Sequence, residues 1–241
     1  MRCYTNDKSE KIMNQSIPDY GNEGRNYWIC EEGSMMRELC ESNLRDLSYF
    51  LRTIEKFIDD GEHSETEEIV RRYKDRAVDW SEEHPWWWQG VLGVQLRQSF
   101  IVSLISAAEN HVRDVCESVR TICELPLSFK NLNRGWIQRS RGLLVNLAGF
   151  SSPQESSWEK LDGIYLIRNV IVHSGGRIEE PKKIAKVEKL QKKAPGISVE
   201  GSFLAIDSEF CEFAHDAVTG FFEQLHDQYR DRCRELSQDI V

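Results

Sequence analysis

The sequence lacks an apolar run of the roughly 18 residues that a membrane-spanning helix needs. Its first residues, Met1 to Lys11, are polar, whereas a secretory leader has a basic start followed by an apolar core. These two absences predict a cytoplasmic protein without a membrane partner.

Cysteines are present, but they lack the spacing of a zinc knuckle or of a disulfide framework. The seven residues include no Cys-x-x-Cys pair, and their number is odd. Free cysteine commonly packs as a small apolar side chain. We therefore expect scattered thiols, no bound metal and no other cofactor.

Three common catalytic signatures are also missing. The chain has no glycine-rich phosphate loop, no His-Glu-x-x-His and no Gly-x-Ser-x-Gly. The sequence therefore does not indicate nucleotide hydrolysis on a P-loop, zinc proteolysis or serine hydrolysis.

Positive charge is scarce overall but concentrated in one part of the chain. The net charge is −9, which disfavours nucleic acid as a partner because phosphate binding depends on lysine and arginine. Between residues 126 and 198, however, 13 basic residues stand against six acidic ones, so this stretch carries +7 and the remainder carries −16. The asymmetry fits a basic binding face and, equally well, a solvated lysine-rich surface.

Hydrophobic periodicity predicts an all-α protein in three parts. Residues 1–34 have no sustained period and are expected to form an irregular arm. Residues 35–83 are expected to form a helical hairpin, with one helix ending at Asp59-Asp60-Gly61 and the next starting at the capping box Ser64-Glu65-Thr66-Glu67. Residues 84–241 are expected to form a helical bundle.

Four helices with apolar seams are expected in the bundle. They are a long helix from Pro85 to the residue before Pro126, a shorter one over Trp136 to Leu147, one introduced by Ser152-Pro153, and a final one capped by Asp207. Residues 197–206 resemble two short strands around Glu200-Gly201, which predicts a small β-hairpin before the last helix.

The most distinctive segment is residues 166–176, Leu-Ile-Arg-Asn-Val-Ile-Val-His-Ser-Gly-Gly, at the end of the third of these helices. Arg168 falls on the predicted apolar stripe, where a guanidinium costs free energy unless a partner satisfies its donors. That stripe comprises Leu161, Ile164, Tyr165, Ile171 and Val172. Asn169 and His173 are four residues apart and share one face of the helix.

The end of this helix gives His173 a particular environment. Gly175-Gly176 is expected to stop the helix, which puts His173 in the last turn, where the helix dipole favours the protonated imidazole and suits proton transfer. Arg168 and His173 are separated by roughly 140° around the helix. Long side chains, or a second copy of the site across a two-fold axis, would allow the two residue types to converge.

An arginine, an adjacent polar residue and a histidine near the end of a bundle helix resemble the signature of the HEPN superfamily (higher eukaryotes and prokaryotes nucleotide-binding domains). The resemblance covers residues 84 to 238. It implies a HEPN-like bundle that cleaves RNA without a metal, through attack of a ribose 2'-hydroxyl on the neighbouring phosphate, leaving a 2',3'-cyclic phosphate and a 5'-hydroxyl.

The resemblance also implies roles for the residues of the motif. His173 is the proton carrier, Arg168 is the cation that stabilises the phosphorane, and Asn169 orients the histidine or the phosphate. Two copies of the motif are expected to meet at the interface of a homodimer. A toxin or an anti-phage defence effector is the expected biological role. The candidate RNA contacts near the motif are Arg139, Arg141, Arg177, Lys182 and Lys183.

One position departs from the family pattern. HEPN toxins that resemble partners of small nucleotidyltransferase antitoxins often have a tyrosine two residues after the histidine, and that tyrosine is the group modified. Here the position is Gly175. Control by modification at this site is not expected, and the identity of an antitoxin or other regulatory partner stays open.

Two other functions are compatible with the same residues. A catalytically silent HEPN-like bundle would serve as a nucleotide- or protein-binding scaffold. A plain helical interaction protein would pair Arg168 with a buried carboxylate and bond His173 to a carbonyl.

Side chains outside the motif are expected to be structural or solvated. The histidines predicted on solvated faces are His63, His84, His111 and His226. His215 is expected to pack beside the apolar stripe of the last helix. Trp86-Trp87-Trp88 is expected to pack at the end of the long helix rather than to stack on bases.

Overall fold

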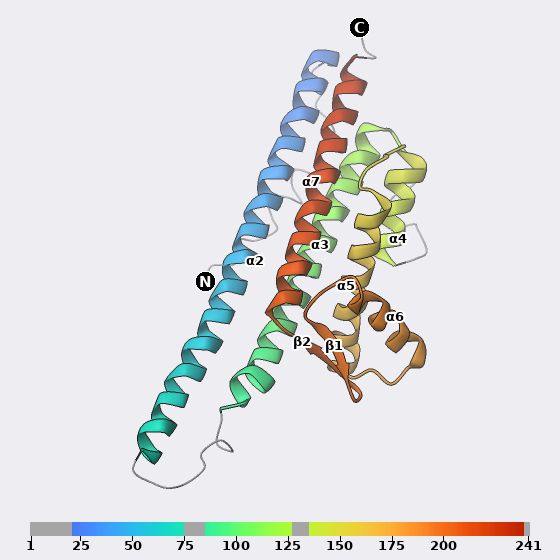
Figure 1. The fold of residues 1–241 in the computed structure, drawn as a ribbon. Coiled ribbons are helices and arrows are strands. Elements are labelled where there is room, and N and C mark those ends of the chain that lie inside the picture. The colour runs from blue at the N-terminus through green and yellow to red at the C-terminus, as the bar shows by residue number, and fades with distance from the viewer. Residues whose placement is uncertain (1–20, 75–84, 127–134, 239–241) are drawn as a thin grey trace.

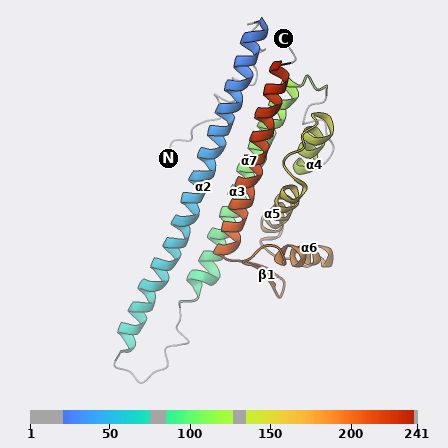
Figure 2. The ribbon, with the colours of Figure 1, turned by 45° about the horizontal axis from the view of Figure 1, so that its top comes forward.

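The computed structural model describes residues 21–74, 85–126 and 135–238, and it shows an all-α protein with one small β-hairpin (Figures 1 and 2). Three long helices lie side by side: α2 (Gly21–Tyr73), α3 (Val94–Ile122) and α7 (Ser208–Gln238). Helix α2 runs antiparallel to the other two, and the elements that lie between α3 and α7 in the sequence are on the side of these helices away from α2 (Figure 1).

One continuous helix occupies the region for which the sequence predicted an arm and a hairpin. Residues 21–34 are helical rather than irregular, and the chain does not turn at Asp59-Asp60-Gly61. With 53 residues, α2 is about 80 Å long at a rise of 1.5 Å per residue. The prediction of an irregular arm was wrong for residues 21–34, and so was the prediction of a hairpin that turns at Asp59-Asp60-Gly61. Residues 1–20 of the expected arm and 75–83 of the expected hairpin lie outside the described residues.

Gly61 is required for close packing rather than for a turn. A β-carbon on Gly61 would lie 2.2 Å from Cη2 of Trp88, which lies just ahead of α3. The ring of Phe57 packs edge-on against the same indole, with the ring centroids 5.6 Å apart. Glu65 caps no helix and instead accepts hydrogen bonds from Nε1 of Trp87 and of Trp88, at 2.8 and 2.7 Å. These contacts explain why α2 continues past Gly61. They also confirm that Trp87 and Trp88 pack at this end of the bundle.

A partly buried ion pair adds to the contact between α2 and α3. Glu55 of α2 accepts hydrogen bonds from Nε and Nη2 of Arg97 of α3, at 2.9 and 2.6 Å. Since α2 contacts both α3 and α7, it shares their core and is one of the helices of the bundle.

The remaining elements include the other predicted helices and strands, some with shifted ends. They are a π-helical turn (Trp88–Gly93) leading into α3, α4 (Trp136–Arg141) continuing into a second π-helical turn (Gly142–Leu147), α5 (Glu155–Ser174), α6 (Pro181–Gln191), β1 (Ile197–Glu200) and β2 (Phe203–Ile206). Helix α5 has Gln154 as its N-cap, so it starts two residues later than predicted. The two strands are antiparallel, with Ile197 opposite Ile206, and they confirm the hairpin before the last helix.

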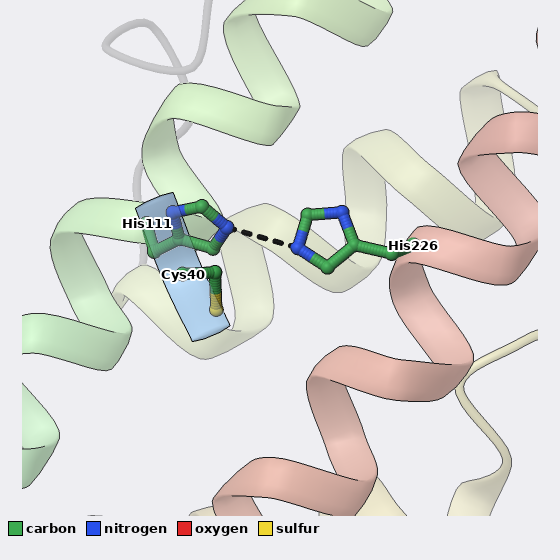
Figure 3. A group of neighbouring side chains, drawn as sticks. All are labelled: Cys40, His111 and His226. Carbon is green, nitrogen blue, oxygen red and sulfur yellow. Dashed lines mark hydrogen bonds between the residues drawn. The ribbon is translucent and has the colours of Figure 1, made fainter. Parts of the chain in front are cut away.

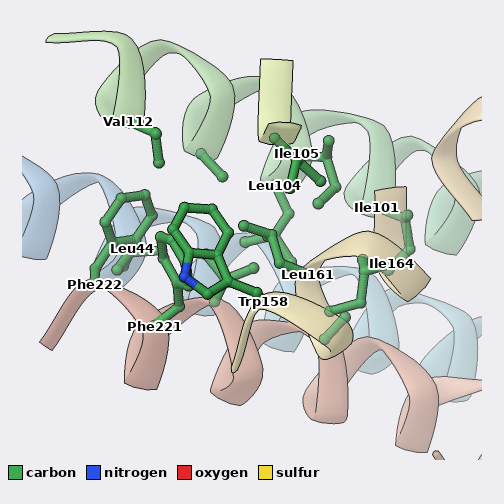
Figure 4. Packing of buried hydrophobic residues seen from close by; sticks show 14 of the residues in the cluster. Leu44, Ile101, Leu104, Ile105, Val112, Trp158, Leu161, Ile164, Phe221 and Phe222 are labelled. Atoms are coloured by element: carbon green, nitrogen blue, oxygen red, sulfur yellow. The ribbon is translucent and has the colours of Figure 1, made fainter. Parts of the chain in front are cut away.

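The core lies where α2, α3, α5 and α7 meet (Figure 4). Trp158 of α5 packs edge-on against Phe221 of α7, with the ring centroids 4.7 Å apart. Leu44 of α2 and Leu104 of α3 belong to the same buried cluster. Helix α5 has buried residues from Ser157 to Val170, and this packing positions the motif near its end.

One helix in the described part of the chain, Trp88–Ile122, is long and apolar enough to cross a membrane by length and composition alone. The sequence had been expected to contain no run of this length. Of the most apolar window of this helix, 44% is buried inside the molecule, and the core helix of a soluble protein meets the same criteria. A protein without a membrane partner therefore remains a prediction.

Candidate functional site

The arginine, asparagine and histidine of the motif lie in the last turns of α5, as predicted. Gly175 adopts the left-handed conformation with a φ of 57°, and its N–H donates to the carbonyl oxygen of Ile171 at 2.9 Å. The N–H of Gly176 donates to the carbonyl oxygen of Val170 at 3.2 Å. This pair of hydrogen bonds is a typical helix end. The side chain of His173, in the last turn, is exposed to solvent.

The β-hairpin holds the chain that follows the motif. The N–H of Ile178 donates to the carbonyl oxygen of Ser202, and the N–H of Leu204 donates to that of Gly176, both at 2.8 Å. Strand β2 in turn packs against α3. The chain just after α5 is therefore held by the β-hairpin, in addition to the core contacts of α5 itself.

The buried face of α5 differs from the predicted stripe. Its largest buried side chains follow steps of three residues: Trp158, Leu161, Ile164, Ile167 and Val170. Each step of three turns the buried position back by about 60°, so the buried line winds around the helix, as happens where helices cross at an angle. Val172, which was assigned to the stripe, is 47% exposed. Arg168 lies beside the buried line and is half-buried.

Arg168 is only partly satisfied within the described residues. Its Nη1 donates a hydrogen bond to Oδ1 of Asn169 at 3.1 Å. Its Nε is buried and has no hydrogen-bond partner among residues 21–74, 85–126 and 135–238. A buried, unpaired guanidinium N–H costs free energy that an anionic ligand would recover.

The contacts expected of a plain interaction protein are not found in the described part of the chain. There, Arg168 forms no ion pair with a carboxylate, and His173 forms no hydrogen bond to a carbonyl. Arg168 therefore keeps hydrogen-bond donors for a ligand, and the ring nitrogens of His173 keep theirs as donor and acceptor.

A pocket of about 620 Å³ opens beside Asn169, lined mainly by α5 and α6. Lys186, Lys189 and Lys193 line it at spacings of three and four residues, which put them on one side of the chain. Lys193 pairs with Glu159 of α5 at 3.1 Å. These lysines belong to the basic stretch of the sequence, but only their spacing of three and four residues from one another would have singled them out.

Most of the basic residues predicted to contact RNA have acidic partners. The ion pairs are Arg141–Glu155, Arg177–Glu179 at 2.7 Å and Lys183–Glu180 at 3.1 Å. Arg139 is half-buried and also interacts with other groups, whereas Lys182 is exposed on α6. Exposed ion pairs contribute little free energy, so these pairs lower the local charge without preventing contact with phosphates.

A second group of reactive side chains lies where α2, α3 and α7 meet (Figure 3). Each helix contributes one residue, namely Cys40, His111 and His226, and their ligating atoms lie within 4.8 Å of one another. The Nε2 atoms of the two histidines are 3.0 Å apart and share a hydrogen bond. Cys40 and His226 are only 3% and 4% exposed.

Burial keeps this group uncharged. It lowers the pKa of His111 to about 3, with a further contribution from His226, and it lowers the pKa of His226 to about 4, with a further contribution from Arg37. Burial also raises the pKa of the Cys40 thiol to about 12. Both imidazoles are therefore neutral at pH 7.

The prediction that His111 and His226 lie on solvated faces was wrong. Two of the three residues do carry a sequence signal. His226 follows the buried Phe222 by four positions, and Cys40 precedes the buried Leu44 by four. Such spacing places a side chain on the buried face of its helix. No spacing along the chain reveals that three separate helices bring these residues together.

The other histidine predictions have mixed outcomes. His63 is exposed, as predicted, and His84 lies outside the described residues. Nε2 of His215 lies 2.9 Å from the carbonyl oxygen of Leu44, which confirms its structural role.

Comparison with models of protein families, with curated proteins and with solved structures finds no match for this chain. The structure defines a protein of the all-α class, built on a bundle of long helices. Any more specific function rests on the motif and on its surroundings.

Proposed function

We propose that the chain is a metal-independent endoribonuclease of HEPN type. The observation that carries the proposal is the state of Arg168, which is half-buried, bonded to Asn169 and left with an unpaired Nε in the described part of the chain. It lies little more than one helical turn from the exposed His173. A cation that lacks an anion, close to a free imidazole, suits phosphoryl transfer.

The residues divide the reaction between them. His173 removes the proton of a ribose 2'-hydroxyl, whose oxygen attacks the adjacent phosphorus. Arg168 binds the non-bridging oxygens and stabilises the phosphorane charge. The 5'-oxygen leaves with a proton from an imidazolium, so the products are a 2',3'-cyclic phosphate and a 5'-hydroxyl.

Asn169 acts as a positioning residue in this mechanism. Its amide oxygen accepts the hydrogen bond from Arg168, and this contact supports a role in orienting the guanidinium rather than the imidazole. Because Asn169 also lines the pocket that contains Lys186 and Lys189, RNA flanking the cleaved bond would lie along α6.

A homodimer completes the proposed site. Arg168 and His173 project in directions roughly 140° apart, so two copies related by a two-fold axis would bring the arginine of one copy near the histidine of the other. Val172, exposed beside His173, would supply an apolar contact for such an interface. The enzyme would act in the cytoplasm as a toxin or an anti-phage effector, with a regulatory protein as a further partner.

Incubation of purified protein with RNA in the presence of EDTA tests the proposal. We expect cleavage that leaves 2',3'-cyclic phosphate ends, with rates falling by about 10²-fold or more in Arg168→Ala and in His173→Ala. Arg71→Ala and His63→Ala, at exposed positions of α2, are matched controls that should retain full activity.

Circular dichroism of each variant separates loss of chemistry from loss of fold. Full activity of folded His173→Ala would contradict the assigned site. A folded wild-type protein that cleaves no RNA would favour the catalytically silent scaffold instead.

A further inference from the structure

The group formed by Cys40, His111 and His226 consists of one thiol and two imidazoles. Thiolate sulfur and imidazole nitrogen are the ligands that Zn²⁺ prefers in proteins, and Zn²⁺ imposes no demanding geometry of its own. We propose that these three residues bind one Zn²⁺ ion. This inference does not depend on the proposed ribonuclease activity.

The two histidines already have the separation of co-ligands. Their Nε2 atoms are 3.0 Å apart, and two nitrogens bound to one tetrahedral Zn²⁺ at about 2.05 Å are about 3.3 Å apart. A Zn²⁺ ion would replace the shared hydrogen, with each ring carrying its proton on Nδ1 instead. The three ligating atoms all lie within 4.8 Å of one another, so an adjustment of roughly 1 Å would bring the thiolate to bonding distance.

A pocket leads from the surface to this group. It has a volume of about 330 Å³, and both Cys40 and His226 line it, together with Arg37 and Glu41. An ion therefore has an entry path that does not require the helices to separate. With three protein ligands, the fourth position of a tetrahedral ion would hold a water molecule from this pocket.

The charges that line the pocket balance, because Arg37 and Arg45 stand against Glu41 and Glu223. Arg37 is already engaged by two carboxylates, Glu41 at 2.8 Å and Asp227 at 3.2 Å. Binding converts the Cys40 thiol to a thiolate, which supplies negative charge at the ion. Each Zn²⁺ bound therefore releases one proton from Cys40.

A bound ion would join the three long helices at one point. Cys40 comes from α2, His111 from α3 and His226 from α7 (Figure 3). The site resembles those of helical bundles in which facing helices each contribute ligands to a buried metal. The ion would therefore stabilise the packing of α2 on the rest of the bundle.

The test uses the full-length protein after dialysis against EDTA, with Zn²⁺ and Co²⁺ as probes. Isothermal titration should show one Zn²⁺ per chain, with one proton released per ion. Co²⁺ should give a thiolate-to-metal charge-transfer band. Since loss of even an outer-shell partner weakens metal binding 10- to 100-fold, Cys40→Ser and His226→Gln should weaken it by more than about 100-fold.

Cys123→Ser and His63→Ala serve as controls, because they remove a thiol at the C-cap of α3 and an imidazole of α2 outside the group. They should bind Zn²⁺ as the wild type does. The Co²⁺ spectrum of the wild type reports thiolate ligation even if a variant fails to fold. Absence of stoichiometric binding to the folded wild type, or binding unchanged in Cys40→Ser and His226→Gln, would overturn the inference.

Discussion

His173 and His226 are both histidines of long helices, yet their surroundings give them different chemistry. His173 lies in the last turn of α5 with its ring in solvent, where a ligand can reach it. His226 is 4% exposed and shares a hydrogen bond with His111, and burial lowers its pKa so that it is neutral at pH 7. Residue type alone therefore does not distinguish a candidate catalytic residue from a buried one.

Acidification should destabilise the protein through His111 and His226. An unfolded histidine binds a proton near pH 6.5, whereas the folded pKa values are about 3 and about 4. Between pH 6.5 and 4 the unfolded state binds more protons, so the free energy of unfolding falls as the pH falls, by up to about 1.4 kcal/mol per pH unit for each histidine. Urea unfolding of metal-free protein across this range measures the slope.

The double variant His111→Gln/His226→Gln provides the comparison for this slope. Asp114 and Asp162, whose pKa values burial raises, have an opposite effect that is present in both proteins and cancels. The variant should therefore show a shallower loss of stability with acid. Equal slopes in the two proteins would be inconsistent with the lowered histidine pKa values.

At the scale of the element, a glycine ends α5 but does not end α2. The end of α5 is determined by Gly175, because a left-handed residue is available there and the last carbonyls accept its hydrogen bonds. Helix α2 contains an equally plausible stop at Gly61, but the indole of Trp88 occupies the space beside it and the helix continues. A glycine thus ends one helix and allows a close approach in another.

Two glycine substitutions should have opposite effects on stability. Gly61→Ala places a methyl group 2.2 Å from Trp88 and should reduce the free energy of unfolding by about 1–3 kcal/mol, despite the better helix propensity of alanine. Gly220→Ala in α7 meets nothing within 4 Å and should increase it by about 0.5–1 kcal/mol. Thermal or urea unfolding of both variants measures the difference.

The role of the indole can be isolated in a Trp88→Leu background. There the cost of Gly61→Ala should shrink, because the smaller side chain leaves room for the methyl group. A stabilising Gly61→Ala in the wild type would show that the close contact does not constrain the helix.

At the scale of the whole molecule, the two candidate sites lie in different places. The motif lies at the end of α5 beside the basic α6, whereas Cys40, His111 and His226 lie in the core between α2, α3 and α7. The two groups share none of their residues. RNA cleavage and metal binding are therefore separate hypotheses that separate variants test.

The proposed dimer makes a prediction about mass. Light scattering after gel filtration should give about twice the 28.1 kDa of one chain. Val172→Glu puts a charge on an exposed apolar side chain next to His173, so it should shift the protein toward monomer and reduce RNA cleavage. Val70→Glu, at an exposed apolar position of α2, is the control and should remain a dimer.

A wild-type monomer at micromolar concentration would contradict the shared site. A dimer that Val172→Glu leaves intact would place the interface elsewhere on the molecule.

The sequence by itself determined the all-α class, the β-hairpin before α7 and the end of α5, because helical periodicity, strand patterns and glycine caps act over a few residues. It also indicated the motif of Arg168, Asn169 and His173 as the candidate site. Only the tertiary structure decided that α2 is continuous, that Arg168 lies beside the buried line, and that Cys40 meets His111 and His226. These features depend on contacts between side chains far apart in the sequence, such as Gly61 with Trp88, which local propensities do not contain.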